Sequence, residues 1–178
     1  MKNRIEQTLG NCKFQHVCEC IEKNSFETNS TETFYILDEK DNEQPVRIVT
    51  ALDNYQLTVN NFSAKEISLL KTDNCLLTDD TQKCDCILFD NQKLFFVEIK
   101  TSSTGSRGSK RKSAREQLGI TIDLFKQNSI DISQYQTTAI ICFKSIEPRI
   151  VNSARDTARA EFWGNHHINL EEKNVIEF

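Results

Sequence analysis

The chain has 178 residues, and its 22 basic and 26 acidic side chains give a formal net charge of −4. With 27% charged and 38% hydrophobic residues it is typical of a soluble globular protein, and the scarcity of glycine and proline excludes collagen-like and linker-rich chains. No apolar run approaches the ~20 residues of a membrane helix, and the N-terminus lacks the apolar core of a signal peptide. We therefore expect one domain, residues 1–178, that acts in the cytoplasm without a membrane partner.

The cysteines support a reducing compartment. There are seven of them, an odd number, which argues against a disulfide framework. Cys84 and Cys86 alternate along a β-like run, so we expect both on one strand face as small buried hydrophobic residues. An alternative is a zinc or iron–sulfur site built from the N-terminal group Cys12, His16, Cys18 and Cys20.

The first third of the chain predicts a helix followed by a β-meander. Apolar residues recur at helical spacing within residues 3–24, at Phe14, Val17, Cys18 and Ile21. Two β-like runs, 33–37 and 46–52, flank a turn-rich segment, and a third run at 55–59 extends the meander. Ser63 followed by Glu66 has the spacing of a capping box, which predicts a short helix to about Leu70.

The second half shows clearer periodicity. The expected strands are 75–78, 83–89, 93–100, 137–143 and 174–178. A small-residue loop at 101–110 leads into a helix over 109–128, whose apolar stripe is Ala114, Leu118, Ile122 and Phe125. Asn152 or Ser153 could cap a last helix to about Trp163. The order predicts an α/β protein with a mixed central sheet flanked by helices, a core at 63–143, an extension at 1–62 and a C-terminal helix and strand at 144–178.

The most informative segment is the strand Leu94–Lys100, which reads LFFVEIK. Both of its faces are apolar until the end, as in a central strand covered on both sides. Glu98 and Lys100 then share the face that carries Leu94 and Phe96. Burying such charges costs several kcal/mol unless they are paired or bind a metal.

The preceding strand brings a second carboxylate to this place. If Asn91–Gln92 forms the hairpin turn, Asp85 stands directly opposite Glu98. If Asp90–Asn91 forms it, Asp85 is diagonal to Glu98 on the same face. Either register brings the two side chains within about 5–8 Å. Two buried carboxylates so close repel each other, and Mg²⁺ or Mn²⁺ would relieve the repulsion.

The pattern Asp85–x12–Glu98–x–Lys100 resembles the PD-(D/E)XK nuclease superfamily, in which Asp and ExK lie on adjacent strands. The resemblance covers about 63–143 and implies a restriction-endonuclease-like core that hydrolyses phosphodiester bonds. It implies that Asp85, Glu98 and the Ile99 carbonyl bind the metal and that Lys100 positions the attacking water. The proline that often precedes the Asp is replaced by Cys84. Small members of the superfamily often act in restriction, repair or anti-phage defence, commonly beside a partner protein.

The same resemblance points to two further side chains. Many members carry a Gln in the helix after ExK, and Gln117 lies beside the apolar stripe of the expected helix. Many also carry a metal-binding Glu in the first core helix. Glu66 fits that role best by order, with Glu19 and Glu22 as alternatives.

The segment after Lys100 concentrates positive charge. Residues 101–115 hold five basic side chains and no acid, which leaves 17 basic against 26 acidic residues elsewhere. These are Arg107, Lys110, Arg111, Lys112 and Arg115. Basic groups beside the expected site would neutralise phosphates, with DNA preferred over RNA as the substrate. Because the whole chain is acidic, we expect a partner protein or a homo-oligomer to add affinity.

Three other interpretations stay open. Glu98 and Lys100 could form an exposed ion pair at a strand end, and a nuclease-like fold could serve as a silent interaction module in a larger nucleic-acid-processing complex. A cysteine-based redox or metal-binding protein is the third alternative. His166 and His167 are interpreted as a polar turn before the last strand.

Overall fold

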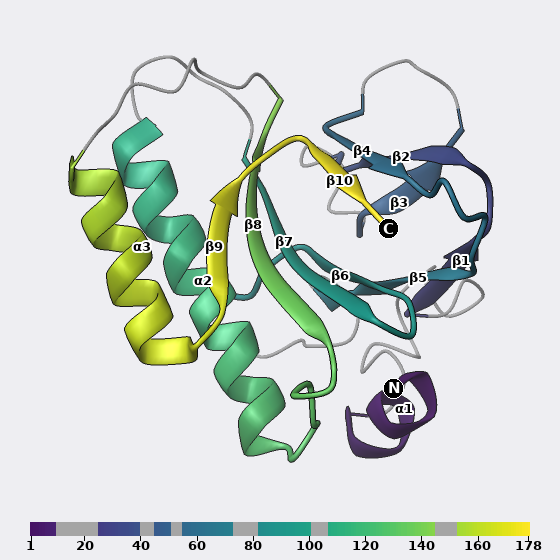
Figure 1. Ribbon diagram of the computed structural model, residues 1–178, viewed down its shortest axis with the longest axis horizontal. Helices are drawn as coiled ribbons and strands as arrows, with labels where there is room; N and C mark the ends of the chain where they lie inside the picture. Colours follow the sequence, from purple (N-terminus) through teal and green to yellow (C-terminus); the bar gives the residue numbers. More distant parts are fainter. Residues whose placement is uncertain (10–24, 40–44, 51–54, 73–81, 101–106, 145–152) are drawn as a thin grey trace.

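The computed structural model describes residues 1–9, 25–39, 45–50, 55–72, 82–100, 107–144 and 153–178. Figure 1 shows them as three layers, with helices on one side of a large sheet and a smaller sheet on the other side. The protein is therefore of the mixed α/β class, as predicted. In the part of the chain so described, no helix is long and apolar enough to cross a membrane.

The large sheet has six strands in the order β1-β5-β6-β7-β8-β9. In this order each neighbouring pair from β1 through β5 and β6 to β7 is antiparallel, whereas β7, β8 and β9 run parallel. The strands are β1 (Phe26–Asn29), β5 (Ile67–Lys71), β6 (Cys86–Phe89), β7 (Lys93–Lys100), β8 (Gln136–Phe143) and β9 (Asn169–Glu172). β7 is central and buried on both faces, which confirms the interpretation of its continuous apolar run.

The small sheet covers the face from which Phe95, Val97 and Ile99 project. It consists of β2 (Thr33–Leu37), β3 (Arg47–Val49), β4 (Leu57–Asn60) and β10 (Val175–Glu177). Its order is β10-β4-β2-β3, so the third run of the predicted meander pairs with β2 and not with β3. The layer between the sheets is apolar, and the ring of Phe178 packs edge-on against Phe95 with 5.1 Å between the centroids.

On the opposite face of the large sheet, the described part of the chain forms three helices. They are α1 (Lys2–Leu9), α2 (Arg107–Gln127) and α3 (Ser153–His166). The predicted stripe on α2 is confirmed, because Ala114, Leu118, Ile122 and Phe125 are all buried against the sheet. The helix begins at Arg107, so the expected loop to residue 110 is wrong for its last four residues.

The predicted helix after Ser63 is also wrong, since residues 67–71 form β5. All five residues of β5 are buried, with β1 on one side and β6 on the other. Layers cover the sheet on both sides, so both faces of β5 are buried: Leu70 packs into the helix-side core, and Ile67 and Leu69 pack into the core between the sheets. The tertiary environment therefore overrides the local capping pattern.

The large sheet takes strands from all three predicted segments of the chain. β1 from the N-terminal extension and β9 from the C-terminal segment both belong to the large sheet. β9 was not predicted, because its NLEE sequence has no strand-like alternation. The rest of the predicted helix at 3–24 beyond α1, and the strand predicted at 75–78, lie outside the described residues.

Candidate active site

The β6–β7 hairpin has the first of the two predicted registers. Cys86 pairs with Val97 and Phe89 pairs with Leu94, so the turn is at Asn91–Gln92. Continued by one residue, this register places Asp85 opposite Glu98. The strand begins at Cys86, three residues later than predicted, and Asp85 lies in a bend just before it.

The bend changes how the two neighbouring cysteines pack. Cys84 packs with the helix-side core, whereas Cys86 packs with the core between the sheets. The prediction that both share one face is therefore wrong, because the chain turns at Asp85. The Asp85 carboxylate is buried, and its Oδ2 accepts a hydrogen bond of 2.5 Å from the backbone N–H of Ile99. This contact ties the start of β6 to the end of β7.

Glu98 and Lys100 form a buried ion pair at the end of β7. The Glu98 side chain is fully buried, and the Lys100 side chain is 13% exposed. Lys100 Nζ lies 2.5 Å from Glu98 Oε1. The exposed strand-end pair considered as an alternative is thus not what the fold contains, and the two charges meet where desolvation is costly.

Gln117 of α2 completes a contact between helix and strand. Its Oε1 accepts hydrogen bonds from Lys100 Nζ at 2.6 Å and from Ser113 Oγ at 3.2 Å. Its Nε2 donates to the backbone carbonyl of Lys83 at 3.0 Å. One amide therefore holds both the Lys100 ammonium and the segment that leads into Asp85.

Two threonines that sequence reasoning missed hold the same segment. The backbone N–H of Cys84 donates to Thr121 Oγ1 at 2.9 Å, and the hydroxyl of Thr72 donates to the Cys84 carbonyl. Thr72 and Thr121 are fully buried. Thr121 lies one helical turn after Gln117, which is the spacing that could have revealed it. The backbone before Asp85 is thus fixed from β5 and from α2.

The thiols beside the site are held in the neutral form. Burial raises the pKa of Cys84 to about 12, the hydrogen bond with Thr121 opposes this rise, and the negative charges of Glu98 and Asp85 reinforce it. Burial and the Asp85 charge likewise raise the pKa of Cys142 to about 12. Both carboxylates therefore act on the thiol of Cys84, and neither thiol is a ready nucleophile.

The donor set suits a hard divalent cation. Asp85 and Glu98 offer carboxylate oxygens, and Ile99, which follows Glu98 and whose N–H donates to Asp85, offers a backbone carbonyl. Carboxylates, a carbonyl and waters are the ligands that Mg²⁺ takes. No group of three His, Cys, Asp or Glu side chains within the described ranges converges to hold a metal by itself. A metal here would therefore need the carbonyl or water to complete its shell.

Glu66 does not belong to this constellation, contrary to the prediction. It is exposed and lines a cavity with Asp90 and Tyr135, at the turn end of the hairpin. The reason is that residues 67–71 form a strand antiparallel to β6, which places Glu66 at the end of the sheet away from Glu98. Glu19 and Glu22 lie outside the described residues.

The basic residues of α2 differ in their surroundings. The guanidinium carbons of Arg107 and Arg111 lie 4.9 and 5.4 Å from the ring centroid of Phe143. Phe143 pairs with Lys100 in the β7–β8 ladder, so these arginines are close to the ion pair. Arg111 also makes a bidentate contact of 2.8 and 3.0 Å with Glu172, which fixes α2 to β9. Of the other three, Lys112 is exposed, Lys110 and Arg115 partly buried.

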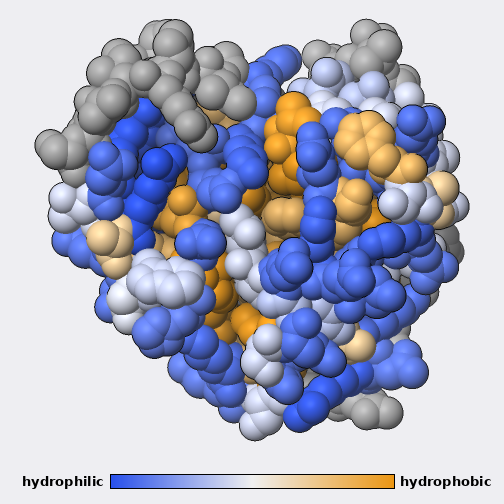
Figure 2. All heavy atoms as spheres, in the orientation of Figure 1, coloured by the Kyte–Doolittle hydropathy of each residue, from blue (hydrophilic) through white to orange (hydrophobic). Residues whose placement is uncertain are grey.

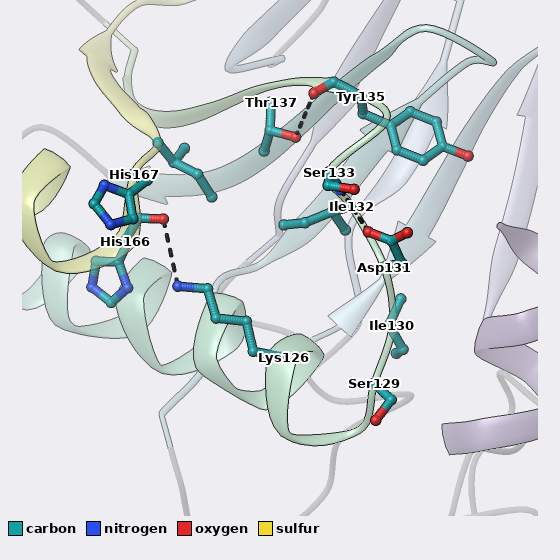
Figure 3. Close-up of a pocket in the computed structure, with 11 residues that line it drawn as sticks. Lys126, Ser129, Ile130, Asp131, Ile132, Ser133, Tyr135, Thr137, His166 and His167 are labelled. Carbon is teal, nitrogen blue, oxygen red and sulfur yellow. Dashed lines mark hydrogen bonds between the residues drawn. The ribbon is translucent and has the colours of Figure 1, made fainter.

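The histidines lie at the other end of α2. His166 is the last residue of α3, and its Nδ1 lies 3.2 Å from Asp123 Oδ1. A Cβ at Gly119 would come within 2.9 Å of His166 Nε2, so glycine permits this close packing of α3 on α2. Figure 3 shows both histidines beside a cavity of about 570 Å³ that Lys126 and Tyr135 also line. This cavity is remote from Glu98, and the histidines are not part of the candidate active site.

Comparisons with known proteins do not identify a family. No protein-family model matches the chain, and no curated protein or solved structure shows significant similarity to it.

Proposed function

We propose that the protein is a metal-dependent nuclease with a restriction-endonuclease-like core, which hydrolyses phosphodiester bonds of DNA rather than RNA. The proposal is supported by the order β5-β6-β7-α2-β8, with an antiparallel hairpin followed by a helical crossover to a parallel strand. Asp85 and the Glu98–Ile99–Lys100 motif stand at the open end of that hairpin.

The observation that carries the proposal is the position of the Lys100 ammonium. It contacts the Glu98 carboxylate at 2.5 Å and the Gln117 amide oxygen at 2.6 Å. Charge buried in this way adds little to stability compared with apolar packing. A buried ammonium held by a carboxylate and by a helix side chain is typical of a site that uses charge for chemistry.

In this mechanism Asp85, Glu98 and the carbonyl of Ile99 would hold Mg²⁺ or Mn²⁺. When bound, the metal would polarise the scissile phosphate and lower the pKa of water. Lys100 would orient the attacking water and stabilise negative charge that develops on the phosphate. Gln117 would keep the Lys100 ammonium in place, and the anchors on Cys84 would keep the Asp85 backbone in place.

We further propose that the protein acts in the cytoplasm, in restriction, repair or anti-phage defence. The buried free thiols of Cys84, Cys86 and Cys142 agree with a reducing compartment. The formal charge of −4 makes strong solitary binding to nucleic acid unfavourable. A partner protein or a second copy of the chain would supply the missing affinity.

The proposal is tested with plasmid, linear and single-stranded DNA and with RNA, each incubated with Mg²⁺, Mn²⁺ or EDTA. We expect cleavage that requires metal and that Lys100→Ala and Glu98→Ala lower by about 10²-fold or more, as for loss of an electrostatic catalytic group. Circular dichroism of both variants checks that they fold. Absence of cleavage by the wild type on all substrates would refute the enzyme.

The silent interaction module stays as a second candidate. The observation in its favour is that Lys100 already supplies a counter-ion to Glu98, so the buried charges are paired without metal. This candidate predicts no cleavage and no effect of Mg²⁺ on thermal unfolding. The nuclease predicts cleavage and a change of thermal unfolding with Mg²⁺.

A further inference from the structure

Four arginines from two helices line one small hollow on the helical face. Arg111 and Arg115 come from α2, and Arg155 and Arg159 come from the N-terminal half of α3. Ala158, which lies between the two α3 arginines in sequence, also lines the hollow, as do Glu171 and Glu172. The sequence does not show that these arginines meet, because α2 and α3 are separated by β8 and their adjacency is tertiary.

This arginine cluster is continuous with the candidate active site. Lys100 and Phe143 are partners in the β7–β8 ladder. The guanidinium groups of Arg107 and Arg111 lie over the Phe143 ring, and Arg111 then borders the hollow. One aromatic side chain therefore separates Lys100 from the first arginines. Figure 2 shows the strongly hydrophilic surface over the upper parts of α2 and α3.

The arginines of the cluster differ in how tightly they are bound to carboxylates of the protein. Arg111 is 13% exposed and bound in two hydrogen bonds to Glu172, so it has a structural role. Arg159 is 47% exposed, and its ion pair with Asp156 is long at 3.7 Å. Exposed pairs of this kind contribute little and exchange readily for a better anion. Planar guanidinium groups bind phosphate oxygens through two parallel hydrogen bonds.

We propose that Arg155 and Arg159 extend the nucleic-acid surface from α2 onto α3 and bind backbone phosphates away from the scissile bond. The inference deepens the proposed function and rests on it for the identity of the ligand. Phosphate contacts fix the position of a strand without reading its sequence. The two arginines are therefore binding residues and not catalytic residues.

The test is the salt dependence of binding, measured on the full wild-type chain in EDTA so that no cleavage interferes. Fluorescence anisotropy with a labelled DNA duplex and with one of its strands gives Kd over a salt series. The double variant Arg155→Ala/Arg159→Ala should raise Kd by about 10-fold or more near 0.1 M salt. It should also reduce the slope of log K against log salt by about 1.8 for duplex and about 1.4 for a single strand.

Arg47→Ala/Lys126→Ala is the matched control, because it removes the same charge from β3 and from the far end of α2. The slope of log K against log salt should be nearly the same for this control variant as for the wild type. Arg155→Lys/Arg159→Lys should keep the slope, and thermal melting should show that every variant is folded. The inference would be overturned if Arg155→Ala/Arg159→Ala had the slope and Kd of the wild type. It would also be overturned if the wild type bound neither probe at low salt.

Failure of this inference and failure of the proposed function give different results. If the wild type cleaves DNA with Mg²⁺ but the double alanine variant binds like the parent, the nuclease stands and the α3 surface is wrong. If the wild type never cleaves but the slope falls as expected, the α3 surface stands and the catalytic proposal is wrong.

Discussion

The β6–β7 hairpin buries a carboxylate at each of its ends, and the two are held in different ways. At the turn, Asp90 Oδ1 accepts hydrogen bonds from the backbone N–H groups of Gln92 at 2.7 Å and Lys93 at 2.6 Å. Its Oδ2 lies 3.2 Å from Lys65 Nζ. At the open end, Glu98 lies 2.5 Å from a lysine that a helix holds in place.

This difference separates a structural charge from a candidate functional one. One oxygen of the Asp90 carboxylate is satisfied by the backbone of its own turn and the other pairs with Lys65, so the carboxylate has a structural role in the hairpin. Glu98 and Lys100 depend on the approach of α2, with Gln117 as the contact. A buried pair that needs a third element is costly for the fold, and apolar residues would replace it at little loss. The open end therefore calls for a functional explanation.

The largest expected effect comes from removing the lysine at the open end. Lys100→Ala leaves Glu98 buried without its observed counter-ion and should lower the free energy of unfolding by about 3–5 kcal/mol in EDTA. Because the carboxylates then lack a cation, Mg²⁺ should raise the stability of this variant more than that of the wild type. Urea denaturation with and without Mg²⁺ measures both changes.

Lys65→Ala is the control at the turn end, where backbone donors still hold Asp90. Its cost should stay below about 1 kcal/mol and should not respond to Mg²⁺. Equal costs for the two lysine variants would remove the distinction between the two ends.

The next effect concerns the anchor before Asp85. Thr121→Val removes the oxygen that accepts from the buried N–H of Cys84, which should cost about 1–3 kcal/mol. It should also lower cleavage and weaken the response to Mg²⁺, because the Asp85 backbone loses one of its supports. Thr121→Ser keeps the hydroxyl and should behave as the wild type in chemical denaturation and cleavage assays. Full activity of Thr121→Val would show that this anchor does not position Asp85.

A smaller effect is expected at the turn, where Asp90 should make the stability of the protein depend on pH. Burial raises the pKa of Asp90, but the hydrogen bonds from Lys93, Gln92 and Lys65 outweigh it and lower the pKa below 3.8. The folded form thus gains stability from ionised Asp90 above pH 3.8 and loses it as the pH falls through the lowered pKa. Asp90→Asn should lower the free energy of unfolding by about 1 kcal/mol near neutral pH. This variant should not show the loss of stability that protonation of Asp90 causes in the wild type as the pH falls. Urea denaturation over an acid pH series would contradict the prediction if both proteins lost stability in parallel.

The smallest effect is expected at Glu66. This residue is exposed and remote from Glu98, so Glu66→Ala should change stability by less than about 0.5 kcal/mol. Cleavage and its Mg²⁺ dependence should stay at the wild-type level, as measured by initial rates. A loss of metal dependence in this variant would reinstate Glu66 as a ligand.

The sequence predicted the parts that depend on local periodicity. Alternation along Leu94–Lys100 gave the faces of β7, hairpin geometry gave one of two registers for Asp85 and Glu98, and the helical stripe gave the buried face of α2. The contact of Gln117 with Lys100 agrees with its expected position beside that stripe. These features are set by neighbours close in sequence or by a tight turn.

Tertiary features could not be predicted in the same way. The capping pattern at Ser63 was outweighed by the pairing of β5 with two strands and by its burial between two layers, and the polar β9 became a strand only through pairing with β8. The backbone just before the bend at Asp85 is held by Thr72, which follows β5, and by Thr121 of α2. Arg155 joins the basic residues of α2 only because α3 packs beside that helix.

The most direct measurement compares the same chemical change at the two ends of the hairpin. Plasmid cleavage with Mg²⁺ is followed for the wild type, Glu98→Gln and Asp90→Asn, each of which replaces a carboxylate with an amide of nearly the same shape. We predict that Glu98→Gln and EDTA abolish cleavage, whereas Asp90→Asn cleaves like the wild type. Undiminished, metal-dependent cleavage by Glu98→Gln would contradict the assignment of the active site to the open end of the hairpin.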